Sequence, residues 1–149
     1  MRLSKNFSRA EIEHSNTAKR LGISNEMSEK HLENMQRLVD NLIQPLRNSI
    51  GSIRISSGYR SPSLNRAIGG SSRSQHSKAE ALDLQFWSEG KMNNKVIYDW
   101  IIDSGLEFDQ MINEFDFSWI HISLKKNSNR KQVLEAYKDK DGDTAYRLV

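Results

Sequence analysis

Hydrophobic residues recur at three- and four-residue intervals in the first third of the chain, which predicts helices with one buried face. The clearest set follows Ser28 and comprises Leu32, Met35, Leu38, Val39, Leu42 and Leu46. We expect Pro45 to kink the end of this helix. A shorter helical segment covers residues 9–21, with a capping box at its start, a break expected near Ser15 and a stop at Gly22.

Alternation of apolar and polar residues in the middle of the chain predicts strands. In residues 81–86 the apolar side chains point into the core and Asp83 projects from the opposite face. Three further segments alternate in the same way: 53–57, 108–114 and 118–124. We expect the last two to be joined by a short turn, and Trp119 and His121 to share one face of the second.

The remaining segments complete one compact domain over residues 1–149. A short helix follows Pro62, residues 70–77 form a polar loop, and a second core helix covers 94–104. The tail from residue 127 onward is polar, with a turn and a last strand at 144–149.

Composition excludes several classes of protein. Of the 149 residues 36% are hydrophobic and 28% charged, and no apolar run approaches the roughly 20 residues of a membrane span. The absence of cysteine excludes thiolate metal ligands and thiol nucleophiles. The net charge of +3 is small, and the arginines of the chain form no dense run, so we expect no nucleic-acid partner.

His76, Asp83 and His121 all lie on or beside predicted strands. Two histidines and one carboxylate match the ligand set of a catalytic zinc site, which leaves a fourth position for water. From residue types alone, polar side chains on a solvated sheet face are the favoured interpretation, because any chain with four histidines and 19 acidic residues can supply such a trio.

The local sequence around these residues favours the metal site. Residues 74–83 read SQHSKAEALD, which closely resembles the S-x-H-x-x-G-x-A-x-D motif of the M15 metallopeptidases. Residues 55–62 (ISSGYRSP), Asn65 with the following glycine pair, and residues 119–123 (WIHIS) resemble other motifs of that family, and the N-terminal segment is similar to its small single-domain branch. The family contains D-alanyl-D-alanine carboxypeptidases and phage L-alanyl-D-glutamate endopeptidases.

The resemblance implies an α+β fold, with an antiparallel sheet that carries a zinc cleft and with flanking helices, as in the hedgehog and DD-peptidase fold. It also implies that one Zn²⁺ is held by His76, Asp83 and His121. Arg60 resembles the family arginine that steadies a substrate carbonyl or carboxylate. Ala79 stands where the motif has glycine, in a conformation that alanine can also adopt.

The general base is less directly indicated. Many family members carry an acid three residues before the last histidine, where this chain has Ser118. We favour Glu114, at the end of the preceding strand, with Asp116 in the expected turn as the second candidate. Ser74, Gln75 and Trp119 are expected to orient ligands or to line the substrate site.

The expected function is zinc-dependent hydrolysis of an amide bond in bacterial peptidoglycan peptide, by an endopeptidase or a D,D-carboxypeptidase. The alternative is a non-catalytic zinc-containing domain that binds the cell wall or serves a structural role in a virion, favoured by the missing acid at Ser118. The first residues lack a secretory apolar stretch. We therefore expect the protein to stay in a host cytoplasm before release to the wall, or to be associated with a virion. We also expect it to be a monomer.

Overall fold

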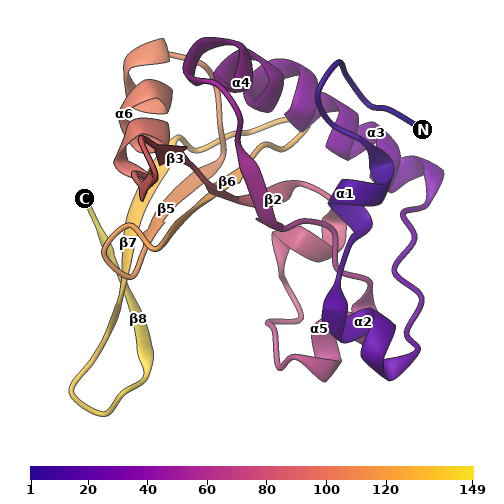
Figure 1. Ribbon diagram of the computed structural model, residues 1–149. Coiled ribbons are helices and arrows are strands. Elements are labelled where there is room, and N and C mark those ends of the chain that lie inside the picture. Colours follow the sequence, from indigo (N-terminus) through magenta and orange to yellow (C-terminus); the bar gives the residue numbers. More distant parts are fainter.

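A computed structural model describes all residues from Met1 to Val149. Its centre is a six-stranded sheet with strand order β1-β2-β6-β5-β7-β8. A separate two-stranded hairpin joins β3 to β4 beside it (Figure 1). The strands are β1 Arg54–Ser57, β2 Ala81–Gln85, β3 Trp87–Ser88, β4 Lys91–Met92, β5 Gln110–Glu114, β6 Trp119–Ser123, β7 Gln132–Lys138 and β8 Thr144–Leu148.

The α+β class is confirmed, but the sheet is mixed rather than antiparallel throughout. β5 and β7 run parallel, whereas every other neighbouring pair is antiparallel. Ser123 at the end of β6 and Gln132 at the start of β7 both pair with Gln110. The connecting loop therefore only has to cross the end of β5, which makes a parallel neighbour possible without a long crossover helix.

The six α-helices are α1 Arg9–Glu13, α2 Asn16–Leu21, α3 Glu29–Leu38, α4 Gln44–Ile50, α5 Pro62–Ala67 and α6 Lys95–Ser104, with a π-helical turn η1 Val39–Ile43 and a 3₁₀ turn η2 Gln75–Lys78. Of these, α1, α3, α4 and α6 contribute side chains to the core on one face of the sheet (Figure 1). The break expected near Ser15 separates α1 from α2. None of these helices is long and apolar enough to cross a membrane.

Pro45 is accommodated by a widened helical turn. The chain continues from α3 through η1 into α4, with Pro45 in the first turn of α4. The amide of Gln44 donates to the Val39 carbonyl, five residues back rather than four. Because proline has no amide hydrogen, a π turn just before it removes the conflict that proline causes inside a regular α-helix.

The core lies between these helices and the apolar face of the sheet. Leu82 and Leu84 of β2 are fully buried in one cluster with side chains of α3, α4 and α6. Asp83, between them in the sequence, faces the opposite side, as the alternation predicts. The opposite face of the central strands is thus left free to carry polar side chains.

Several elements differ from the sequence expectation. The 70–77 segment, expected to be a loop, ends in η2, and neither the β3–β4 hairpin nor β7 was predicted. β7 is flanked by β5 and β8, and most of its side chains are only half-buried. Its sequence therefore lacks the clear apolar and polar alternation that marks β2.

Candidate metal centre

His76, Asp83 and His121 lie together on the polar face of the sheet. One ligand atom from each residue lies within 4.8 Å of those of the other two. Asp83 of β2 is directly opposite His121 of β6, so both side chains emerge from the same face. His76 reaches the same point from η2, the turn that precedes β2.

The donor set fits a tetrahedral zinc ion. Asp83 Oδ1 lies 3.2 Å from His76 Nε2 and 3.2 Å from His121 Nδ1. Zinc bonds of about 2.0–2.1 Å in a tetrahedron place neighbouring ligand atoms about 3.3–3.4 Å apart. The carboxylate oxygen lies at about this spacing from both nitrogens, and all three ligand atoms lie within 4.8 Å of one another, which leaves room for a fourth ligand.

Backbone contacts fix His76 in place. Its Nδ1 lies 2.8 Å from the Gly58 carbonyl oxygen, which can only accept a hydrogen bond. With a metal bound, the proton of a neutral His76 would therefore reside on Nδ1, and Nε2 would direct its lone pair to the metal. Ser74 caps η2 by accepting from the His76 amide, and Ala79 ends the turn in the left-handed conformation.

The charge of Asp83 is stabilised by its two neighbours. Burial by itself would raise the pKa of the Asp83 carboxyl, but His76 and His121 outweigh burial and hold the pKa well below its usual range. Asp83 is therefore a carboxylate at neutral pH, which is the form that binds a cation.

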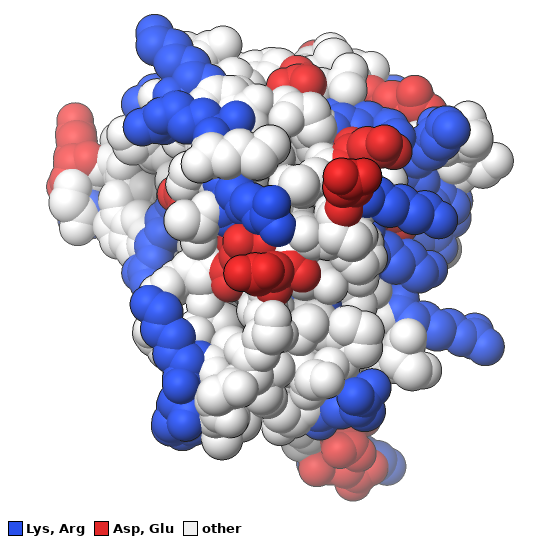
Figure 2. All heavy atoms as spheres, turned by 90° about the vertical axis from the view of Figure 1, so that its right-hand side faces the viewer, with Lys and Arg blue, Asp and Glu red and all other residues white.

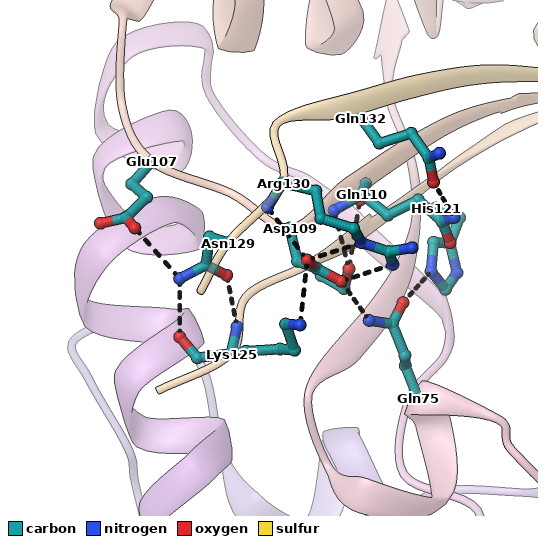
Figure 3. A network of polar contacts seen from close by, with 10 residues as sticks. Gln75, Glu107, Asp109, Gln110, His121, Lys125, Asn129, Arg130 and Gln132 are labelled. Carbon is teal, nitrogen blue, oxygen red and sulfur yellow. Dashed lines mark hydrogen bonds and ion pairs between the residues drawn. The ribbon is translucent and has the colours of Figure 1, made fainter. Parts of the chain in front are cut away.

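A second polar network supports His121 from the side (Figure 3). Gln75 Oε1 lies 3.3 Å from His121 Nε2, and Gln75 Nε2 donates to Asp109 Oδ2 at 2.8 Å. Asp109 is fully buried and accepts from the backbone amide and the guanidinium of Arg130, with Lys125 Nζ 3.5 Å away. Burial raises the pKa of Asp109, but these hydrogen bonds outweigh it and bring the pKa to about 2.

The metal centre opens into a cleft of about 730 Å³. Arg60, Ser74, Gln75 and Trp119, which the sequence assigns to substrate or ligand contacts, all line it, as do the three candidate ligands. Asp116 does not line the cleft, because it is exposed in the turn between β5 and β6.

Glu114 lies in the same cleft. It is buried and pairs with Trp119 across β5 and β6, one diagonal position from His121 on the same face. Burial raises the pKa of the Glu114 carboxyl to about 7; the charge of Asp83 adds to this rise and His121 opposes it. A carboxyl in this state can both accept and return a proton near neutral pH.

Arg60 follows β1 and extends into the cleft. Burial lowers the pKa of its guanidinium, and Asp83 opposes that effect. Nη2 lies 3.5 Å from the Ser74 hydroxyl, while the buried Nε has no hydrogen-bond partner. A guanidinium that lines the cleft is suited to an incoming carbonyl or carboxylate oxygen.

Sequence reasoning missed several cleft residues. Leu134 and Tyr146 reach the cleft from the hairpin of β7 and β8, and Asp109 and Arg130 meet although they are far apart in the sequence. None of them lies in a local motif, so only long-range pairing brings them to the site. On the side of the molecule shown in Figure 2, Lys and Arg lie mostly toward the margins, with small acidic groups between them.

Comparison with known proteins agrees with this geometry. A sequence profile of the peptidase M15 family matches residues 5–123, which include all three candidate ligands, Arg60 and Glu114. No curated protein matches the chain. The β7–β8 hairpin lies beyond the matched residues. The match spans most of the chain, and we conclude that it belongs to the peptidase M15 family.

Proposed function

We propose that this metallopeptidase hydrolyses an amide bond in the peptide of bacterial peptidoglycan, with Glu114 as general base. The family implies peptidase activity and a zinc-dependent site. The observation that carries the proposal is a buried carboxyl, Glu114, in the same cleft as the His76, Asp83 and His121 cluster. Peptidoglycan as substrate is supported by the resemblance of residues 74–83 to enzymes that cut wall peptides.

The chain's own residues can perform the proton transfers of amide hydrolysis. Zinc held by the three ligands would polarise the scissile carbonyl and make a water molecule more acidic. Glu114 would take a proton from the attacking water and deliver it to the leaving amine, because its pKa lies near neutrality. Arg60, which lines the cleft, would hold a substrate carbonyl or carboxylate oxygen.

The basic side chains around the cleft suit an anionic peptide. Arg60, Arg73 and Lys78 line it without forming an ion pair with a carboxylate in the protein. Stem peptides of the wall carry free carboxylates that such cations can bind. The protein would act as a monomer on the wall, either after release from a host cytoplasm or as part of a virion.

A wall-binding domain without activity is the competing function. Its support is Ser118, which replaces the acid found in many relatives. The Ser118 hydroxyl donates to the Phe115 carbonyl at 2.7 Å and therefore stabilises the turn rather than serving as a base. Glu114 supplies a carboxyl in the same cleft, which favours the enzyme.

The test is release of new amino groups from purified peptidoglycan by zinc-loaded protein, with products identified by mass. Wild type is compared with Glu114→Gln and Asp116→Asn, with the zinc content of each verified. We expect Glu114→Gln to lower the rate by about 100-fold or more, the usual contribution of a general base, and Asp116→Asn to change it little. The product masses separate an endopeptidase from a D,D-carboxypeptidase.

Each contrary outcome has a defined meaning. Loss of activity in Asp116→Asn but not in Glu114→Gln would identify Asp116, in the turn between β5 and β6, as the general base. No release from any wall type by fully zinc-loaded wild type would reject hydrolysis in favour of the binding domain.

A further inference from the structure

The two histidines of the metal centre use different ring nitrogens. His76 turns Nε2 toward Asp83 Oδ1, whereas His121 turns Nδ1 toward the same oxygen, each at 3.2 Å. A neutral imidazole carries one proton, and only the other nitrogen can bind a metal. Each histidine therefore needs a partner that holds the proton on the nitrogen facing away from Asp83.

For His76 that partner is the backbone. The Gly58 carbonyl oxygen accepts from Nδ1 at 2.8 Å, and a carbonyl can never donate. For His121 the neighbour is the side-chain amide of Gln75, whose Oε1 lies 3.3 Å from Nε2. An amide offers an oxygen at one end and a nitrogen at the other, so its effect depends on which way it is turned.

Asp109 determines which way the Gln75 amide is turned. Its buried carboxylate has only acceptor oxygens, and Oδ2 lies 2.8 Å from Gln75 Nε2. The guanidinium of Arg130 donates to both oxygens of this carboxylate, its backbone amide donates to Oδ1, and Lys125 lies beside Oδ1. The NH₂ of Gln75 must therefore point at Asp109, which leaves its oxygen for His121 (Figure 3).

We propose that Asp109 and Gln75 are positioning residues which hold the His121 proton on Nε2 and so reserve Nδ1 for the metal. The chain of contacts runs from carboxylate to amide to imidazole, and each step allows only one direction of donation. Such partners of metal-binding histidines typically contribute 10- to 100-fold to metal affinity. The inference concerns metal binding and needs no assumption about the substrate.

The structure predicts what Asp109→Asn does. The amide oxygen of the new side chain should stay at the Oδ1 position, where the backbone amide and Nε of Arg130 and the ammonium of Lys125 supply donors. Its NH₂ then faces Gln75, which has to turn over and present its own NH₂ to His121. His121 would next accept on Nε2 and carry its proton on Nδ1, the wrong nitrogen for the metal.

A double variant should restore the direction of hydrogen bonding that keeps the His121 proton on Nε2. In Asp109→Asn with Gln75→Glu, the new NH₂ at position 109 donates to the carboxylate at position 75, whose other oxygen accepts from His121 Nε2. The two substitutions exchange amide and carboxylate and leave the net charge unchanged. A merely structural role of the Asp109–Arg130 ion pair predicts no such rescue, since both variants lose that pair.

The experiment measures zinc affinity by competition with a chelator, together with imidazole ¹⁵N signals of the zinc-loaded proteins. We expect zinc on Nδ1 and a proton on Nε2 of His121 in wild type, affinity 10- to 100-fold lower in Asp109→Asn and in Gln75→Met, and recovery in the double variant. Gln132→Met removes a neighbouring amide that lies outside the cleft and is the matched control. Thermal melts establish whether each variant folds. If Asp109→Asn does not fold, the zinc affinity of Gln75→Met, a substitution at a half-buried position, tests the inference in its place.

Two results would overturn the inference. One is zinc affinity and His121 signals in Gln75→Met that match those of Gln132→Met. The other is a weakened Asp109→Asn that the double variant fails to recover. Neither measurement uses a peptide, so either result leaves the proposed hydrolysis to be judged by its own assay.

Discussion

Ala79 shows how a single backbone conformation joins two parts of the site. With φ 58° and ψ 34° it ends η2, which carries His76, and leads the chain into β2, which carries Asp83. This is the left-handed region that glycine occupies at little cost and other residues rarely adopt. This left-handed conformation explains the glycine of the family motif, and alanine adopts the same conformation in this chain.

Substitutions at Ala79 should separate backbone strain from packing. Ala79→Gly should change the free energy of unfolding by less than about 1 kcal/mol, because relief of strain is offset by loss of a buried methyl group. Ala79→Val should destabilise by more than about 2 kcal/mol, because a β-branched residue resists this conformation and the site is fully buried. Urea denaturation measures both, and equal effects of the two would contradict this explanation.

Glu114 should make stability depend on pH in the metal-free protein. Burial raises its pKa from the ordinary 4.5 to about 7, so the folded state holds this proton more tightly than the unfolded state. The stabilisation is complete below pH 4.5 and is lost as the pH rises through 7, with a maximum of about 3 kcal/mol. Glu114→Gln should therefore stabilise the metal-free protein at pH 8 and leave it nearly unchanged at pH 4.5.

Denaturation of metal-free wild type and variant at the two pH values measures this effect. Asp116→Asn, at an exposed position in the adjoining turn, controls for the loss of one carboxylate. A stability difference that is the same at both pH values would show that the Glu114 side chain titrates alike in the folded and unfolded protein.

At the scale of elements, the β5–β6 hairpin sets the position of Glu114 relative to His121. Three consecutive residues of its turn, Phe115, Asp116 and Phe117, have positive φ. This turn pairs Glu114 with Trp119 and leaves Asp116 at its exposed tip. The difference between the two candidate bases is thus a property of the turn, which the residue types alone do not reveal.

Close packing of α1 against β1 fixes the backbone that orients His76. A Cβ at Gly58 would collide with the carbonyl oxygen of Ile12, and the adjoining Tyr59 amide donates to that same oxygen at 2.9 Å. We expect Gly58→Ala to destabilise the fold by about 2 kcal/mol and to weaken zinc binding, because the displaced carbonyl no longer holds His76 Nδ1. Chelator competition and thermal melts measure the two effects.

Gly90→Ala is the matched control for this variant. Its backbone also disfavours alanine, with φ 77°, but the new methyl group would meet no atom within 4 Å. It should cost about 1 kcal/mol of stability and leave zinc affinity unchanged. An equal loss of zinc affinity in both variants would rule out a specific role of the Gly58 carbonyl.

At the scale of the whole molecule, the metal centre joins segments that are distant in the sequence. His76, Asp83 and His121 come from η2, β2 and β6, so an unfolded chain offers no preformed site. Zinc at 1,000 times its Kd should stabilise the fold by about 4 kcal/mol and raise Tm by roughly 10 °C. His121→Ala should abolish the rise, while His14→Ala, at an exposed position, should keep it.

Thermal melts with and without zinc give this comparison directly. An equal rise in Tm for His121→Ala and wild type would mean that zinc binds elsewhere on the protein. The rise also reports zinc binding independently of any catalytic assay.

The sequence by itself determined the elements that repeat a local pattern. Alternation along 81–86 predicted that Asp83 leaves the core face, and the motif of residues 74–83 indicated which histidine accompanies it. The periodicity that follows Ser28 likewise predicted the long helical segment and its buried face. Such patterns can be recognised in the sequence because burial of one face requires apolar side chains at every second residue of a strand, or at every third and fourth residue of a helix.

Only the tertiary structure decided what depends on pairing between distant segments. It shows that β7 runs parallel to β5, that Asp116 lies outside the cleft, and that Asp109 lies between Gln75 and Arg130. A lone aspartate or arginine has the same local signature on the surface as in a buried network. Its role follows from which neighbours the sheet register supplies, and sequence periodicity carries no information about that register beyond each strand itself.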